Sequence, residues 1–296
     1  MGRLKFLVGG LLTHSLGVAM ALAHDATLNV PALLWGQAAV TCIQLMTHYS
    51  NDYFDLAADR ANPTPTPWSG GSRVLLGGWL EPRVALWIAI GLGVVSMGVA
   101  VVLASAVQPG VQTFVLIAVA LLLAWSYSAP PLKLHSRGLG ELTTAVLVPG
   151  LTPLVGFYLQ AGRLGLSLLG VLPLCCMQFA MLLAIEFPDA AGDAVAGKRT
   201  LVVRLGGTRA ARLHATALLI AYGILPVLVV LGLAPLVAAS VSLGAPLAAW
   251  QSRRVLRGTW ADPALWNSLG FWAVALLMGT TAGELVAFLL LAVQGQ

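Results

Sequence analysis

The stretch RVALWIAIGLGVVSMGVAVVLASA, residues 83–106, carries one charged side chain, Arg83, at its first position. A helix needs about 20 apolar residues to cross a bilayer, and lipid offers no partner for an unpaired backbone group. The stretch therefore predicts a transmembrane helix. Similar runs recur along a chain that is 58% hydrophobic and only 9% charged, against roughly 25% charged in a soluble domain. We expect an all-α polytopic membrane protein that forms a single domain over residues 1–296.

Nine such runs can be counted, and short and long connections alternate between them. The predicted spans are 5–23, 31–50, 83–106, 111–129, 139–161, 166–187, 210–232, 233–250 and 267–292. The long polar loops are 51–82, 130–138, 188–209 and 251–266.

The basic residues predict the orientation of this path. Of the 16 Lys and Arg residues, 15 lie at the N-terminus or in and beside the long loops, and only Arg163 lies on the other side. Because Lys and Arg favour the cytoplasmic side, we expect the N-terminus and the long loops in the cytoplasm and the C-terminus outside. The expected location is a bacterial-type inner (plasma) membrane. Topology and anionic lipid explain the net charge of +5 without any nucleic-acid partner.

Acidic residues are scarce, and most of them lie in two clusters. Of the 11 in the chain, Asp52, Asp55 and Asp59 follow the second span, whereas Asp189 and Asp193 follow the sixth, with Glu186 just upstream. The spacing i, i+3, i+7 places such side chains on one face of a helix. Carboxylates crowded beside hydrocarbon are costly unless a cation joins them.

Mg²⁺ suits such a site because it prefers carboxylate oxygens and keeps positions free for phosphate. The two clusters therefore predict a site where Mg²⁺ ions bridge one diphosphate. The candidate ligands are Asn51, Asp52, Asp55, Asp59, Glu186, Asp189 and Asp193. We expect Asp52, Asp55 and Asp189 to be essential for catalysis. Ordinary solvated loop acids are the alternative interpretation.

Basic side chains near the clusters could stabilise the charge that grows on a leaving diphosphate. The candidates are Lys133, Arg137, Lys198, Arg73 and Arg60. Lys133 is the strongest of them and a candidate catalytic residue, because prolines stiffen its loop between two spans. The alternative role for each is a cytoplasmic anchor of the topology.

Four further residues could line a pocket for an acceptor or a carbocation. The ring faces of Tyr127 and Tyr158 could stabilise a cation, and Gln178 and His48 are polar groups within spans. Interfacial aromatic residues and helix–helix hydrogen bonds are the corresponding alternatives.

The two clusters resemble the aspartate-rich motifs of the UbiA superfamily of intramembrane prenyltransferases. The similar segments are NDYFDLAAD (51–59), DAAGD (189–193) and the basic loop YSAPPLKLHSRG (127–138). AGKRTL (196–201), VRLG (203–206) and SGGSRVL (69–75) are most similar to 1,4-dihydroxy-2-naphthoate prenyltransferases of menaquinone synthesis. The resemblance covers most of the chain and implies a helical bundle with a central cavity open to lipid.

The implied activity is Mg²⁺-dependent transfer of a polyprenyl group from a prenyl diphosphate to an aromatic acceptor. The acceptor expected is 1,4-dihydroxy-2-naphthoate, in menaquinone biosynthesis. Other acceptors of the superfamily, namely 4-hydroxybenzoate, chlorophyllide, haem or a carotenoid, stay open. A membrane transporter is the alternative outside this class, although its polar residues should be spread across the bilayer instead of gathered on one face.

Overall fold

The computed structural model describes residues 1–295, which form helices and loops with no strand among them. The α-helices are α1 (Leu4–Leu22), α2 (Val30–Phe54), α3 (Leu56–Ala61), α4 (Pro82–Val102), α5 (Val111–Ser128), α6 (Gly140–Ala145), α7 (Thr152–Ala161), α8 (Val171–Glu186), α9 (Ala190–Val195), α10 (Leu201–Leu205), α11 (Gly207–Gly223), α12 (Leu225–Val230), α13 (Pro235–Ser242), α14 (Ala245–Leu256) and α15 (Trp266–Gln294). A short π-helical segment of Val146–Leu151 joins α6 to α7.

Local start signals explain where several of these helices begin. The Asn29 side chain accepts the backbone N–H of Ala32 at 3.0 Å, and Pro31 stands in the first turn of α2. Pro82 opens α4 in the same way. An Asn cap satisfies a free N–H at the helix start, and proline fits there because it needs no donor.

Eight helical segments within the described residues are long and apolar enough to cross a membrane. They are Lys5–Leu22, Val30–Phe54, Pro82–Val107, Val111–Ser128, Gly140–Ala161, Leu168–Glu186, Gly207–Val230 and Pro263–Gln294. Each coincides with one of the predicted spans, so the all-helical membrane fold is confirmed.

The predicted span 233–250 differs, because it is divided into α13 and α14. The two helices meet at Leu243 and Gly244. Pro246 lies in the first turn of α14 and cannot donate a backbone hydrogen bond to α13. A Cβ atom at Gly244 would lie 2.7 Å from the Tyr222 hydroxyl, so a tight contact with α11 also fixes the break.

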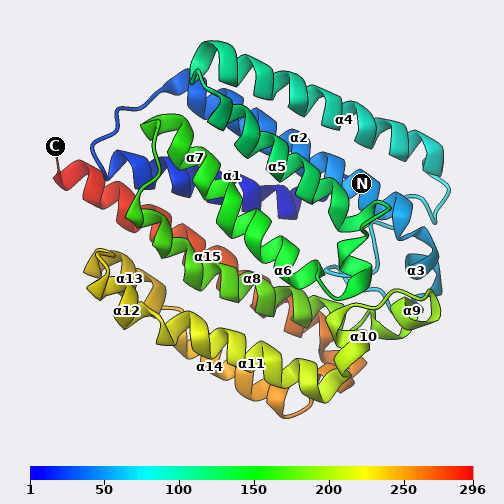
Figure 1. Ribbon diagram of the computed structural model, residues 1–296. Coiled ribbons are helices and arrows are strands. Elements are labelled where there is room, and N and C mark those ends of the chain that lie inside the picture. The colour runs from blue at the N-terminus through cyan, green and yellow to red at the C-terminus, as the bar shows by residue number, and fades with distance from the viewer. Residues whose placement is uncertain (296) are drawn as a thin grey trace.

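The bundle has two buried cores. One lies among α1, α8, α11 and α15, and the other among α2, α4, α5 and α7. Figure 1 shows the N-terminus, α3, α9 and α10 at one end of the bundle and the C-terminus at the opposite end. The segments that carry the two acidic clusters therefore share one end.

The short helices α3 and α9 lie against each other at this end. Gly192 of α9 allows the close approach, because a Cβ atom there would lie 2.9 Å from both the backbone N and Cα of Asn62. Two motifs about 140 residues apart in the sequence thus become neighbours in space.

Candidate active site

The first acidic cluster does not lie on one continuous helix. The helix α2 ends at Phe54, and Asp55 leaves the helical path with φ −93° and ψ 3° before α3 begins at Leu56. Asp52 and Asp55 are 3% and 7% exposed. The predicted single helical face is therefore replaced by a bend, which turns the Asp55 side chain toward other elements.

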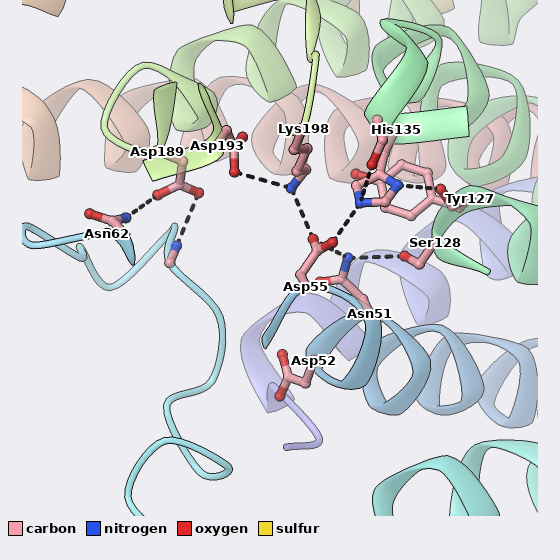
Figure 2. Close-up of polar contacts among 12 residues, drawn as sticks. Asn51, Asp52, Asp55, Asn62, Tyr127, Ser128, His135, Asp189, Asp193 and Lys198 are labelled. Atoms are coloured by element: carbon pink, nitrogen blue, oxygen red, sulfur yellow. Dashed lines mark hydrogen bonds and ion pairs between the residues drawn. The ribbon is translucent and has the colours of Figure 1, made fainter. Parts of the chain in front are cut away.

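Asp55 bonds to side chains of three other residues (Figure 2). Its Oδ1 lies 2.6 Å from His135 Nε2, and its Oδ2 accepts from Lys198 Nζ and Asn51 Nδ2, both at 2.9 Å. Asn51 Nδ2 also donates to Ser128 Oγ at 3.0 Å. The bend is thus fixed by α5, by the loop that follows it and by the loop that follows α9.

Asp52 faces the N-terminal segment and the long loop 62–81. Arg3 Nη2 donates to Asp52 Oδ1 at 3.1 Å, and the Ser72 backbone N–H donates to the same oxygen at 3.3 Å. The Ser72 hydroxyl donates to Oδ2. The first two carboxylates of the first motif, Asp52 and Asp55, therefore bond to different partners.

The second cluster also follows a helix end. The helix α8 stops at Glu186, next to Phe187 and Pro188, and α9 begins at Ala190. Asp189, in this turn, accepts from Asn62 Nδ2 at 2.6 Å and from the Gly70 backbone N–H at 3.0 Å. Asn62 and Gly70, which follow the first motif in the sequence, thus hold Asp189 of the second motif.

Lys198 joins the two clusters directly. Its ammonium group lies 2.9 Å from Asp55 Oδ2 and 3.5 Å from Asp193 Oδ1. Figure 2 shows the lysine between the two carboxylates. The prediction that both clusters meet at one place agrees with this geometry.

Burial and the neighbouring charges shift the pKa values of these acids. Burial, with the charges of Asp55 and Asp52, raises the pKa of Asp59 to about 7. Burial likewise raises the pKa of Asp193 to about 7, against the opposing charge of Lys198. Burial would also raise the pKa of Asp55, but Lys198 and His135 outweigh it and hold that pKa below its ordinary value. The cluster is short of positive charge.

The other predicted cations lie further out. Lys133, Arg137 and Arg60 are exposed, and among the described residues none of them bonds to a cluster carboxylate. Arg73 instead donates to the backbone carbonyls of Asp59 and Asn62, the latter at 3.0 Å. It closes the end of α3, whose last carbonyls lack helical partners.

Glu186 interacts with the Glu141 carboxyl and, more weakly, with Asp193. Both side chains are buried, and Glu141 Oε1 accepts the backbone N–H of Leu201 at 2.9 Å. One oxygen of each remains without a partner. Two facing carboxyl groups must share a proton or a cation, so Glu186 stays a candidate ligand that acts with Glu141.

Several residues of the site were not among the predicted ones. They are Arg3, Asn62, Ser72, Ser128, His135 and Glu141. Asn62 could have been found, since it lies three residues after Asp59, a spacing that repeats the motif. His135 lies between the two predicted cations of its loop, where only the fold reveals which side chain turns inward.

A cavity of about 230 Å³ adjoins the clusters. Its lining includes Arg3, Gln44, Thr47, His48, Asn51, Ile117, Tyr127, Leu147, Leu151, Val155, Gln178 and Met181. The predicted pocket residues Tyr127, Gln178 and His48 belong to it. Tyr158 does not, because it lies one turn beyond Val155, the last residue of α7 that lines the cavity.

The side chains of the clusters offer Mg²⁺ a free carboxylate oxygen, but they are too few to hold the ion by themselves. Asp193 Oδ2 is buried without a hydrogen-bond partner, which leaves it available to a cation. In residues 1–295 no three His, Cys, Asp or Glu side chains are close enough to hold a metal by themselves. Mg²⁺ commonly takes one or two carboxylates and completes its shell with phosphate oxygens and water. The residues therefore fit Mg²⁺ bound together with a phosphorylated substrate.

An all-helical membrane bundle with two acidic motifs that meet beside an apolar cavity defines a class, the integral membrane transferases of prenyl groups. The model of the UbiA prenyltransferase family matches residues 11–276, and the chain belongs to this family.

Similar proteins come from archaea. Digeranylgeranylglyceryl phosphate synthase of Thermococcus gammatolerans is 29% identical over 163 residues, which are 54% of this chain and 52% of that protein. The chain is thus aligned to about half the length of that relative. A UbiA homolog from Aeropyrum pernix K1 in its apo form has a TM-score of 0.70 at 16% identity, covering 94% of this chain and 97% of its own.

A UbiA homolog from Archaeoglobus fulgidus bound to GPP and Mg²⁺ has a TM-score of 0.61 at 15% identity, covering 96% of this chain and 99% of its own. At these identities the two structures establish the fold of the chain. Family membership makes it a prenyl-transferring transferase, as the sequence predicted.

Proposed function

We propose that the chain transfers a polyprenyl group from a prenyl diphosphate to an anionic acceptor, with Mg²⁺ as cofactor. One observation carries this proposal. The apolar cavity reaches the acidic clusters at Asn51, which lines the cavity and also donates to Asp55. A tail and a diphosphate of one molecule could therefore occupy the two regions at once. The Archaeoglobus homolog holds GPP and Mg²⁺.

The residues that would hold Mg²⁺ are Asn51, Asp52, Asp55, Asp59, Asp189 and Asp193, with Glu186 as a further candidate. When bound, the ion would neutralise the diphosphate and favour its departure. Lys198 lies where it can donate to the leaving group, and Lys133, Arg137, Arg73 and Arg60 would attract the anion from the loops.

The wall of the cavity would bind the prenyl tail and stabilise the allylic cation. Apolar side chains such as Leu147 and Val155 would accept the prenyl tail from the lipid and keep water away from the allylic cation. The ring of Tyr127 lies at the cavity end nearest the clusters and would stabilise that cation through its face. The acceptor attacks the cation and loses a proton or, for a dihydroxynaphthoate, carbon dioxide.

Polar groups of the cavity indicate where the acceptor binds. Gln44, Thr47 and His48 follow one face of α2, and Gln44 Oε1 and His48 Nδ1 are buried without partners. Arg3 lines the cavity beside them. A carboxylate or phosphate of the acceptor could accept from Arg3 and from His48 Nδ1 in its N–H form, and an acceptor hydroxyl could donate to Gln44 Oε1. The motif resemblance favours 1,4-dihydroxy-2-naphthoate, and hence menaquinone biosynthesis.

A prenylated glyceryl phosphate is the second candidate acceptor. It is favoured by the 29% identity to digeranylgeranylglyceryl phosphate synthase. Both candidates carry an anion and would use the same polar face, so the distinction depends on the shape of the remainder of the cavity.

We further propose a topology with nine crossings, in which α13 and α14 together make the eighth. Their 8 and 12 residues with the two between them would extend about 33 Å at 1.5 Å per residue, enough for the hydrocarbon core. The N-terminus and the acidic loops would face the cytoplasm of a bacterial-type cell, and the C-terminus the outside.

A product assay tests the proposed function. Purified protein in nanodiscs receives geranylgeranyl diphosphate, Mg²⁺ and one acceptor at a time, and mass spectrometry follows the product. 1,4-Dihydroxy-2-naphthoate, 4-hydroxybenzoate and geranylgeranylglyceryl phosphate are the acceptors. We expect Mg²⁺-dependent release of diphosphate, which a transporter would not give, and one prenylated product. Absence of release with every acceptor would overturn the proposal.

A further inference from the structure

The loop between α5 and α6 directs a histidine, and not its flanking cations, into the site. His135 is 2% exposed, whereas Lys133 and Arg137 are exposed. Its Nδ1 lies 2.5 Å from the Tyr127 carbonyl oxygen, and its Nε2 lies 2.6 Å from Asp55 Oδ1. The ring also lies against that of Tyr127, with centroids 5.1 Å apart and an angle of 31°.

The two closest polar contacts of the ring are with acceptors, and the Ser136 hydroxyl lies further away, 3.4 Å from Nε2. A carbonyl oxygen and a carboxylate have no hydrogen to give, so each ring nitrogen facing them donates. The histidine is therefore held at two points, one on the backbone of α5 and one on Asp55. Figure 2 shows the ring between Tyr127 and Asp55.

The loop leaves the ring little freedom to turn away. The Arg199 backbone N–H donates to the Ser136 carbonyl at 3.2 Å, and Arg204 Nη1 donates to the Arg137 carbonyl at 2.6 Å. A Cβ atom at Gly140 would lie 2.9 Å from His135 Cα. Arg199 and Arg204, which follow the second motif in the sequence, thus fix the loop that carries His135.

We propose that His135 is a positioning residue that fixes the Asp55 carboxylate for metal binding. This inference rests on the proposed function. Asp55 lies at a bend outside regular helix, so its orientation depends on side-chain partners. Lys198 and Asn51 both contact Oδ2, which leaves His135 as the partner of Oδ1. Outer partners of this kind typically contribute about 10–100-fold to metal affinity.

Two amide variants separate the two contacts of the ring. In His135→Asn the amide nitrogen takes the place of Nδ1, so it can donate to the Tyr127 carbonyl but cannot reach Asp55. In His135→Gln the amide nitrogen takes the place of Nε2 and can reach Asp55. His24→Gln is the matched control, because this histidine also bonds to a backbone carbonyl, that of Met20, at 2.9 Å.

The readout is binding of Mn²⁺, in place of Mg²⁺, to purified protein with inorganic diphosphate, followed by electron paramagnetic resonance. We expect His135→Asn to weaken Mn²⁺ binding by about 10–100-fold. His135→Gln should stay within about threefold of the wild type, as should His24→Gln, on the same scale. The Mg²⁺ concentration that gives half-maximal transfer should shift in parallel.

Wild-type affinity in His135→Asn would overturn the positioning role while leaving the proposed function intact. Equal loss in both amide variants would overturn it as well, because the reach to Asp55 would then be irrelevant. Absence of Mn²⁺ binding in the wild type, with no product in the transfer assay, would overturn both the positioning role and the proposed function.

Discussion

Asp52 is the first aspartate of the first motif and Asp189 the first of the second, and each is held by donors from other segments. Arg3 and Ser72 hold the first, whereas Asn62 and Gly70 hold the second. Asp52 lies in the last turn of α2 and Asp189 in the turn before α9, so both lie at the end of the bundle. Their loss should therefore affect chemistry more than folding.

Asp52→Ala and Asp189→Ala should each lower prenyl transfer by at least about 100-fold, the scale of losing one preorganised electrostatic group. Product formation by mass spectrometry and the circular dichroism melting curve are the two measurements. Asp262→Ala is the control, since this exposed acid caps a short turn and bonds to no residue of the motifs. Transfer at the wild-type rate in either motif variant would remove the metal role.

Lys198 supplies the positive charge that joins the clusters. Lys198→Met should leave Asp55 and Asp193 without compensation and destabilise the protein by about 3–5 kcal/mol, as when one partner of a buried ion pair is removed. The thermal midpoint should fall in metal-free buffer. Mg²⁺ with diphosphate should restore part of the loss, and an unchanged midpoint in metal-free buffer would contradict this role.

Single residues also show which parts of the site could be predicted from the sequence. The aspartates were predictable because carboxylates are rare in this chain and repeat at helical spacing. The side chain of loop 130–138 that turns inward could not be predicted from the sequence, since a loop has no periodicity that reveals its inner face. His135 is recognised only once the bend at Asp55 places a carboxylate 2.6 Å from it.

At the scale of the elements, the contact between α3 and α9 depends on Gly192. Gly192→Ala should move α9 away from Asn62, because the new Cβ would lie 2.9 Å from backbone atoms that cannot yield. We expect a loss of activity and a lower melting temperature. The Mg²⁺ dependence of transfer and the thermal midpoint check this.

Gly91→Ala is the matched control for that substitution. Gly91 lies within α4 and has open space around its Cβ position. Alanine in a helix interior is favoured over glycine by roughly 0.5–1 kcal/mol, so this variant should be neutral or more stable. Equal effects of both substitutions would show that the α3–α9 approach is not tight.

The existence of the spans followed from hydrophobic length, but their interruptions did not. The breaks at Asp55 and at Gly244 result from contacts between distant segments, namely the partners of Asp55 and the packing of Gly244 on Tyr222. Local signals accompany two of the interruptions, namely Pro188 at the turn after α8 and Pro246 in the first turn of α14. Helix ends set by tertiary contacts cannot be predicted from local sequence.

For the whole molecule, the proposed topology places the two termini on opposite sides of the membrane. In a variant with Cys42, Cys175 and Cys176 replaced by alanine, Ala196→Cys should react with an impermeant maleimide only from the cytoplasmic side. Gln294→Cys should react only from outside. Labelling of both from one side would require an even number of crossings.

The ion pairs of Lys198 also bear on how the polypeptide matures. Asp55 precedes Lys198 by 143 residues, so it leaves the ribosome long before its counterion does. Once Lys198 has been synthesised, its ammonium group can join the later part of the chain to Asp55 in the earlier part. The contact between these two parts of the chain is thus an ion pair within the polypeptide itself.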